Sequence, residues 1–456
     1  MPEKPPGRAG GAAGARRVAL GACLAVERGQ RAREALEAEL AAAGGLSAAD
    51  RHLATELLYG TVRLMRRLDY LLERFSRRPL RLLQPEVRWA LRLALFQLSE
   101  TSVPEHAAVY ETLEALRAAG GKAGVGYANA VLRQALRRRE EWSLPEGAEA
   151  EALAIRHSFP DWLARRWVER YGSGEAERLM RYMNEPPPLT VRVNRLRARP
   201  EEALERLRAA GLEAEPGLTG AQVIRLRGGS PAELPGWSEG WYQVQSEASF
   251  LIGLSVGAKP GERILDVAAA PGGKSTHLAE QTGDRGLVLA VDVDAGRLRR
   301  VKENARRLGL RSIRLLAEDA RRLAARLEPG SFDRVLVDAP CTGTGVLNRR
   351  PEARWRKRPG DVAAAARLQA QILDGVAPLV RPGGTLVYST CTLEPEENAA
   401  TVEAFLRRWP TFRREALAPW LPERLAGRVE REGEIQLLPQ RDGLDGHYIA
   451  RLAREA

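Results

Sequence analysis

The sequence predicts a multidomain protein with an all-α helical bundle at residues 1–140, a small α+β module at 160–255 and an α/β domain at 256–456. Three observations predict this arrangement. The chain has 456 residues, which is more than one hydrophobic core usually supports. Its first part repeats apolar residues at spacings of three and four, as amphipathic helices do. Its last part alternates short apolar runs with helical segments, which is typical of a doubly wound, mostly parallel sheet.

The first domain is predicted to contain about six or seven helices. The helical periodicity is clearest in three segments, residues 15–40, 47–75 and 85–100. The breaks between them contain glycine, proline or serine, which stop helices. Ser47, with Asp50 three residues later, is suited to capping the start of a helix. Cys23 lies on an apolar helical face, so we expect it in the core.

The distribution of charge indicates a polyanionic partner. The net charge is +12, and residues 1–140 hold 23 Lys and Arg against 15 Asp and Glu, so +8 of it belongs to the first domain. A basic surface attracts nucleic acid because its cations displace the counterions of the phosphates. A solvated basic face is the plainer alternative.

A glycine-rich stretch, "GGKAGVG" at 120–126, precedes a predicted helix that ends in Arg137, Arg138 and Arg139. Exposed amides in such a loop can approach a phosphate, and the arginines can contact RNA. Cations at the carboxyl end of a helix also interact favourably with the helix dipole. The pattern therefore favours RNA contact and a purely structural role about equally.

Short strands are predicted in both of the following domains. In the α+β module they lie at 189–197 and 221–228, with a helix at 200–211 between them. The α/β domain has five, at 263–268, 286–294, 312–319, 332–340 and 384–391. Parallel strands of this kind bind ligands at their carboxyl ends.

Polar residues and glycines follow these strands. In the first loop, Pro271, Gly272 and Gly273 let the backbone approach a ligand just before a helix. Asp292 follows Gly272 by 20 residues, the spacing at which an acid binds the hydroxyls of a ribose, whereas Asp294 suits a helix cap. Further carboxylates at the same edge are Asp266, Asp319 and Asp338. By itself this pattern fits a nicotinamide dinucleotide and S-adenosylmethionine equally.

Two cysteines, Cys341 in "DAPCTGTG" and Cys391 in "STCT", also follow strands. The cysteine spacing matches no zinc or iron–sulfur pattern, so we expect no metal site, and thiols agree with a reducing compartment. A thiolate can add to C6 of a pyrimidine and make C5 nucleophilic enough to accept a methyl group from a sulfonium donor. A second group near C5 would assist loss of the C5 proton and of the enzyme. Two small buried residues at strand ends are the plain alternative to such a pair.

Four motifs in chain order, "DVAAAPGGKSTHLA", "VDVD", "DAPCTGTGV" and "YSTCTLEPEEN", resemble those of the bacterial 16S rRNA cytosine-C5 methyltransferases of the RsmB/Sun type. The N-terminal helices are similar to the NusB RNA-binding domain, so the resemblance covers nearly the whole chain. It implies a NusB-like domain at 1–140, a ferredoxin- or RRM-like RNA-binding module at 160–255 and a Rossmann-like methyltransferase domain at 256–456. It also implies S-adenosylmethionine as cofactor and 16S rRNA, or an assembling small ribosomal subunit, as partner.

The resemblance implies roles that spacing alone does not assign. The family uses the cysteine of the Thr-Cys motif as its nucleophile, which implies that Cys391 attacks the cytosine and that Cys341 assists release of the product. Asp338 and Lys274 are implied to face the target base. The residues implied to hold the methyl donor are Ala268, Ala269, Ala270, Pro271, Gly272, Gly273, Lys274, Asp292, Asp319 and Asp338.

The chain departs from the family pattern at two places. Ala268 stands where the family often has cysteine, and a small residue still suits a donor loop. His447 and Tyr448 replace a more usual pair of phenylalanines. We expect these two to pack the final strand and assign them no catalytic role.

Other functions remain open from the residues alone. A non-catalytic NusB-like RNA-binding or assembly protein is one, a nicotinamide oxidoreductase is another, and methylation of a different RNA such as tRNA is a third. No apolar run approaches the roughly 18 residues that spanning a bilayer needs. The N-terminus lacks the apolar core of a secretory signal. We therefore expect a cytoplasmic protein that does not bind membranes. We also expect it to be a monomer.

Overall fold

The computed structural model describes residues 11–429 and 431–456, which form two compact units, each with its own hydrophobic core. The first unit contains the described residues up to Glu185 together with the segment Leu347–Lys357. The second contains the remaining described residues. Within these described ranges, none of the helices is both long enough and apolar enough to cross a membrane.

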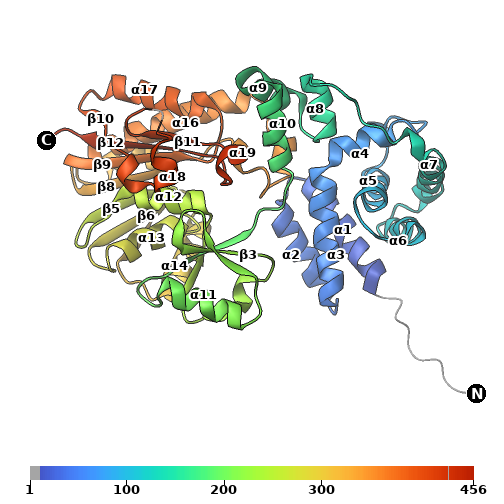
Figure 1. Ribbon diagram of the computed structural model, residues 1–456, viewed down its shortest axis with the longest axis horizontal. Helices are drawn as coiled ribbons and strands as arrows, with labels where there is room; N and C mark the ends of the chain where they lie inside the picture. Colours follow the sequence, from blue (N-terminus) through green and yellow to red (C-terminus); the bar gives the residue numbers. More distant parts are fainter. Residues whose placement is uncertain (1–10, 430) are drawn as a thin grey trace, which may run out of the picture. The chain divides into compact units, whose positions relative to one another are not determined.

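The first unit is built from helices (Figure 1). Apart from short 3-10 turns, they are α1 (Gly11–Glu27), α2 (Ala32–Ala43), α3 (Ala48–Arg63), α4 (Met65–Leu72), α5 (Pro85–Glu100), α6 (Glu105–Ala118), α7 (Val125–Arg137), α8 (Ala150–Arg156), α9 (Asp161–Tyr171), α10 (Ser173–Tyr182) and α15 (Ala353–Arg356). Helix α5 is buried along almost its whole length, because it is apolar on nearly every side and needs neighbours all round. Cys23 is fully buried in this core, as predicted. The predicted helical bundle is confirmed.

Local interactions explain two features of the first unit that the sequence singled out. The Ser47 hydroxyl accepts a hydrogen bond of 3.1 Å from the backbone N–H three residues on, so it caps α3 as predicted. Gly121 and Gly124 lie against the side chains of Leu116 and Val87, respectively, and a Cβ atom at either position would overlap its neighbour. Close packing therefore accounts for these two glycines.

The segment Leu347–Lys357 belongs to the helical unit although the residues on both sides of it belong to the second unit. Arg354 is fully buried, and its guanidinium donates hydrogen bonds of 3.1 Å to the backbone carbonyls of Ser158 and Met183. It also lies 4.0 Å from the centre of the Phe159 ring. Because these carbonyls have few other partners in a dry core, Arg354 anchors the segment firmly.

The second unit begins with a small α+β module. Its elements are β1 (Leu189–Val193), α11 (Pro200–Ala209), β2 (Ala214–Gly217), β3 (Gly220–Leu226) and β4 (Tyr242–Val244). The strands form an antiparallel sheet in the order β2-β3-β1-β4, and the apolar side of α11 packs against it through Leu207. The sequence predicted β1, α11 and β3. It missed β2 and β4, which have four and three residues and are too short to show a period.

The rest of the second unit contains an eight-stranded sheet. Its strands are β5 (Arg263–Val267), β6 (Leu287–Asp292), β7 (Ile313–Ala317), β8 (Phe332–Asp338), β9 (Val380–Thr390), β10 (Phe412–Arg414), β11 (Glu434–Leu437) and β12 (His447–Arg454). The order is β10-β12-β9-β8-β5-β6-β7, with β11 paired to β12. The five predicted strands, β5 to β9, are parallel to one another, and β12 joins β9 antiparallel. The predicted α/β fold is confirmed.

Helices cover both faces of this sheet (Figure 1). One face packs against α12 (Glu247–Val256), α13 (Gly273–Gln281) and α14 (Ala295–Leu308), and the other against α16 (Pro359–Val376) and α17 (Ala399–Arg408). Two shorter helices, α18 (Glu423–Ala426) and α19 (Pro439–Asp442), occur in the last part of the sequence. Because β5 to β9 run parallel, their carboxyl ends share one edge of the sheet, and the predicted site residues follow those ends.

Candidate active site

The loop after β5 has a backbone shaped for close approach to a ligand. Ala268 and Gly272 both have positive φ angles, 59° and 97°. At Gly272 a Cβ atom would lie 2.9 Å from the Val301 side chain, so only glycine fits there. The Asp292 carboxylate accepts a hydrogen bond of 3.2 Å from the Ala270 N–H. The end of β6 therefore holds this loop in place just before α13.

Two polar features lie close to that loop. Asp266, fully buried in β5, accepts a hydrogen bond of 2.5 Å from the Ser275 hydroxyl through Oδ2, while its Oδ1 has no partner among the described residues. Burial raises the pKa of Asp266 to about 7 despite that hydrogen bond. Val293, directly after Asp292, is 75% exposed. The edge thus offers an unmet buried acceptor and a bare apolar surface.

Asp294 caps a helix, as the sequence predicted, and Asp292 does not. Asp294 accepts hydrogen bonds from the backbone N–H groups of Gly296 (2.7 Å) and Arg297 (3.1 Å) and so caps α14. Asp292 is only 3% exposed, and its carboxylate faces the loop after β5. Asp292 also accepts a hydrogen bond of 3.0 Å from the Asp294 N–H and lies 3.4 Å from the Arg297 guanidinium, so it binds the loop together rather than capping the helix.

Lys274 and Asp338 form an ion pair beside the two cysteines. The Lys274 Nζ lies 2.6 Å from Asp338 Oδ2, and the Ser389 hydroxyl donates to Asp338 Oδ1 at 2.9 Å. Burial alone would favour the neutral amine, but the Asp338 carboxylate outweighs it and raises the pKa of Lys274. Attraction to Cys391 acts in the same direction. Lys274 therefore stays an ammonium ion at this edge.

Cys341 and Cys391 lie side by side. Their sulfur atoms are 3.2 Å apart, well beyond the bond length of about 2.05 Å in a disulfide, so both are thiols. The contact follows from strand register, because Asp338 of β8 pairs with Ser389 of β9 and each cysteine comes shortly after. The hydrogen bond with Cys391 and burial both raise the pKa of the Cys341 thiol well above its ordinary value. Cys341 is therefore held in its protonated form.

A buried carboxylate, Glu397, ties the two cysteine loops together. It accepts hydrogen bonds from the Thr342 backbone N–H (2.9 Å) and hydroxyl, from the Thr392 hydroxyl (3.0 Å) and from the Gln369 amide (2.9 Å). Thr342 and Thr392 directly follow Cys341 and Cys391 in the chain. Sequence patterns alone assign no role to Glu397, Thr342, Thr392 or Gln369. Their signal was present in the threonines and acids flanking both cysteines, but only the fold shows that they meet.

We predict that Glu397→Gln lowers both the stability and the catalytic activity of the protein. An amide replaces one acceptor oxygen with a donor, so at least one buried hydrogen bond is lost, at a cost of about 1–3 kcal/mol. Thermal unfolding and single-turnover kinetics measure the two effects. Glu396→Gln, at the exposed neighbouring position, is the matched control. Unfolding and turnover that stay at the level of the control would show that Glu397 does not position the cysteines.

Asp319 is the predicted site residue whose carboxylate is engaged within its own loop. It caps the 3-10 turn after β7 by accepting a hydrogen bond of 3.0 Å from the Arg321 N–H. Its carboxylate is also paired with the Arg321 guanidinium at 2.6 Å, and that hydrogen bond lowers the pKa of Asp319.

His447 and Tyr448 are buried in β12, where Tyr448 pairs with Thr390 of β9.

Comparison with known proteins identifies the family. The probable ribosomal RNA small subunit methyltransferase B of Bacillus subtilis is 37% identical over 444 residues, which cover 96% of this chain and 98% of that protein. The chain belongs to this family of ribosomal RNA small subunit methyltransferases. A relative of the same name from Synechocystis is also 37% identical and covers 90% of the chain.

Family models match each part of the chain in turn. The NusB family matches residues 13–137, the ferredoxin-like domain of RsmF/B-like methyltransferases matches 159–233, and the 16S rRNA methyltransferase RsmB/F family matches 254–453. Among solved structures, that of PH0851 has a TM-score of 0.83 at 27% identity and covers 97% of this chain and 99% of its own. A methyltransferase homolog from Pyrococcus horikoshii, 28% identical with a TM-score of 0.58, covers 68% and 100%. The helical, ferredoxin-like and Rossmann-like fold classes are therefore confirmed.

Membership of the family makes this protein an RNA methyltransferase that uses S-adenosylmethionine. The residues at the sheet edge fit that cofactor. The unmet Asp266 oxygen suits a cationic group such as an ammonium, the buried Asp292 suits ribose hydroxyls, and the bare Val293 suits a flat apolar ring. The Gly272 turn leaves room for backbone contact where a side chain would collide.

Proposed function

We propose that this protein methylates C5 of a cytosine in 16S rRNA through a covalent bond between Cys391 and C6 of the base. The observation that supports the proposal is the thiol pair, with 3.2 Å between the sulfur atoms, at the same sheet edge as the cofactor loop. Cytosine C5 is a poor nucleophile, and addition of a thiolate at C6 is what activates it. A pair of thiols beside a methyl-donor site has no such use in methylation of an oxygen or an exocyclic nitrogen.

In this mechanism the ammonium of Lys274 stabilises the thiolate of Cys391, which adds to C6 and pushes electron density to C5. When bound, S-adenosylmethionine supplies an electrophilic methyl group. Lys274 and Asp338 face the polar edge of the cytosine and steady the charge that develops there. In the last step the C5 proton passes to water, the C5–H electron pair reforms the C5–C6 double bond, and the bond from C6 to sulfur breaks so that Cys391 leaves as a thiolate. Cys341 assists this step as a thiol that donates a hydrogen bond to the departing sulfur.

The residues proposed to hold the methyl donor are Ala268, Ala269, Ala270, Pro271, Gly272, Gly273, Lys274, Asp292, Asp319 and Asp338. Asp319 would accept a hydrogen bond from the adenine amino group in place of Arg321, which occupies it here. Because C5 and C6 must meet donor and thiol together, we propose that the target cytosine is unpaired or flipped out. We further propose that the protein acts as a monomer on 16S rRNA, either naked or in an assembling small subunit.

The test is to incubate the protein with S-adenosylmethionine carrying a labelled methyl group and with 16S rRNA, small ribosomal subunits or tRNA. We expect the label in 5-methylcytosine of 16S rRNA after digestion to nucleosides. Bisulfite mapping of rRNA from cells that lack the protein should then show the loss of one protected cytosine. Label recovered in another nucleoside, or in tRNA alone, would contradict the proposal.

A further inference from the structure

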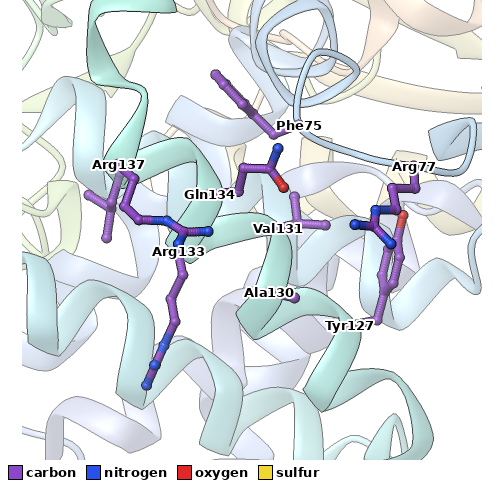
Figure 2. Close-up of a pocket in the computed structure, with 9 residues that line it drawn as sticks. Phe75, Arg77, Tyr127, Ala130, Val131, Arg133, Gln134 and Arg137 are labelled. Atoms are coloured by element: carbon purple, nitrogen blue, oxygen red, sulfur yellow. The ribbon is translucent and has the colours of Figure 1, made fainter.

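The helical unit contains a basic pocket that the reaction described above does not use. It has a volume of about 730 Å³ and lies between α7 and the segment that follows α4. Its polar lining comes from Arg77, Tyr127, Arg133, Gln134 and Arg137 (Figure 2), and no carboxylate lines it. Figure 2 shows Arg77 beside Tyr127 at one side of the pocket and Arg133 with Arg137 at the other.

The three arginines of this pocket share one feature. All three are exposed, and within the described residues none of their side chains makes an ion pair or a hydrogen bond. Some exposed arginines elsewhere on the same unit have acidic partners, as Arg33 has in Glu37 and Arg117 has in Glu114. Cations gathered without compensation repel one another, and an anion that binds between them relieves the repulsion. The pocket is therefore built for a negatively charged ligand.

The floor of the pocket is apolar and aromatic. Phe75 and Val131 are buried beneath it, and the half-buried ring of Tyr127 forms part of its wall. The Tyr127 hydroxyl is 2.8 Å from that of Ser76 and accepts a hydrogen bond from the Arg78 N–H at 3.1 Å, which fixes the ring. Because Phe75 is only 2% exposed, the half-buried Tyr127 ring is the aromatic surface available to a base, and a site for a bare phosphate does not need such a surface.

Gln134 adds a group that can read a base. Its side chain reaches the pocket, is half-buried and makes no hydrogen bond within the described part of the chain. An amide carries two donors and one acceptor, so it can pair with the edge of an unstacked base. The pocket thus combines an amide without a partner among the described residues, an aromatic surface and three cations. Single-stranded RNA can satisfy all three, with a base edge, a base ring and phosphates.

We propose that this pocket binds an unpaired nucleotide of the RNA substrate, with the base on the aromatic floor beside Gln134 and the flanking phosphates on Arg77, Arg133 and Arg137. The proposal rests on RNA being the substrate and extends it by naming a contact site in the helical unit. A protein partner is disfavoured because the charged side chains that line the pocket are all positive and its apolar lining includes aromatic rings. In the glycine-rich stretch before α7, Gly121 and Gly124 pack against neighbouring side chains, as described above.

The test compares full-length variants by fluorescence anisotropy with a labelled short single-stranded oligoribonucleotide, without methyl donor. We expect Arg133→Gln/Arg137→Gln to weaken binding at least about tenfold and to reduce the slope of log affinity against log salt by about 1.4, since each phosphate contact on a single strand contributes about 0.7. Arg33→Gln/Arg117→Gln, which removes two paired exposed arginines of the same unit, is the matched control and should change neither.

A second variant separates base binding from simple charge. Gln134→Ala should reduce the preference for single-stranded over duplex RNA at least about threefold, while the salt slope stays the same. An affinity and slope equal to those of the control variant, or an unchanged strand preference in Gln134→Ala, would overturn the proposal. Because binding is measured without transfer, failure of the C5 chemistry would leave this result intact. In transfer assays the arginine variant should raise KM for RNA and leave kcat unchanged.

Discussion

Cys391→Ser is expected to abolish methyl transfer, with a loss of at least about a thousandfold in rate, and to form no covalent complex with RNA. The serine hydroxyl cannot be deprotonated as a thiol can, and the neighbouring Lys274 ammonium has no thiolate to stabilise. Initial rates with labelled S-adenosylmethionine give the first result. A denaturing gel, on which a protein bound to RNA migrates more slowly, gives the second.

Cys23→Ala is the control for this substitution, since it removes the third thiol of the chain from the core of the other unit. It should retain transfer. A Cys391→Ser protein that transfers methyl groups at a rate near that of the control would refute the assignment of Cys391 as nucleophile. Loss of transfer together with a retained covalent complex would point to Cys341 as the attacking residue.

Cys341→Ser is expected to do the opposite and accumulate the covalent protein–RNA complex. Addition at C6 and methylation need only Cys391 and the donor, whereas the release step loses the group that sits 3.2 Å from the bound sulfur. General acid–base assistance of this kind is worth about a hundredfold or more, so release should slow by at least that factor. The complex is measured on denaturing gels after reaction with RNA and S-adenosylmethionine.

The double variant Cys341→Ser/Cys391→Ser controls for non-specific crosslinking and should form no complex. If Cys341→Ser turned over normally and released its product, Cys341 would have no part in the reaction. If the single variants gave the reverse pattern, with a complex in Cys391→Ser and none in Cys341→Ser, the two roles would have to be exchanged.

The three kinds of fold were predictable because each has a local period. Helices α1 to α7 repeat apolar residues at helical spacing, and β5 to β9 are short apolar runs separated by helices. The caps Ser47 and Asp294 were predictable for the same reason, since a cap acts within three residues of itself. Strands as short as β4 have no period, and their existence depends on a partner far away in the sequence.

Segment Leu347–Lys357 shows the limit of local prediction most clearly. It lies in sequence between the two cysteine motifs, and its pattern gives no sign that it belongs with the helical unit. Arg354 in particular reads as one more surface cation in a chain with many. Its burial depends on the carbonyl groups of Ser158 and Met183, which lie 196 and 171 residues earlier in the chain.

By itself, the sequence determined which groups gather at the candidate site. The loop with Gly272, the acids after successive strands and the two cysteines were all identifiable, because parallel strands place whatever follows them at one edge. Only the tertiary structure decided how those groups are paired. The register of β8 against β9 brings Cys341 to Cys391, the fold of the second unit brings Glu397 to both loops, and Asp319 is turned to Arg321. A hydrogen bond or a thiol contact depends on distances of a few tenths of an ångström, and those are set by packing across the whole core rather than by neighbours in the chain.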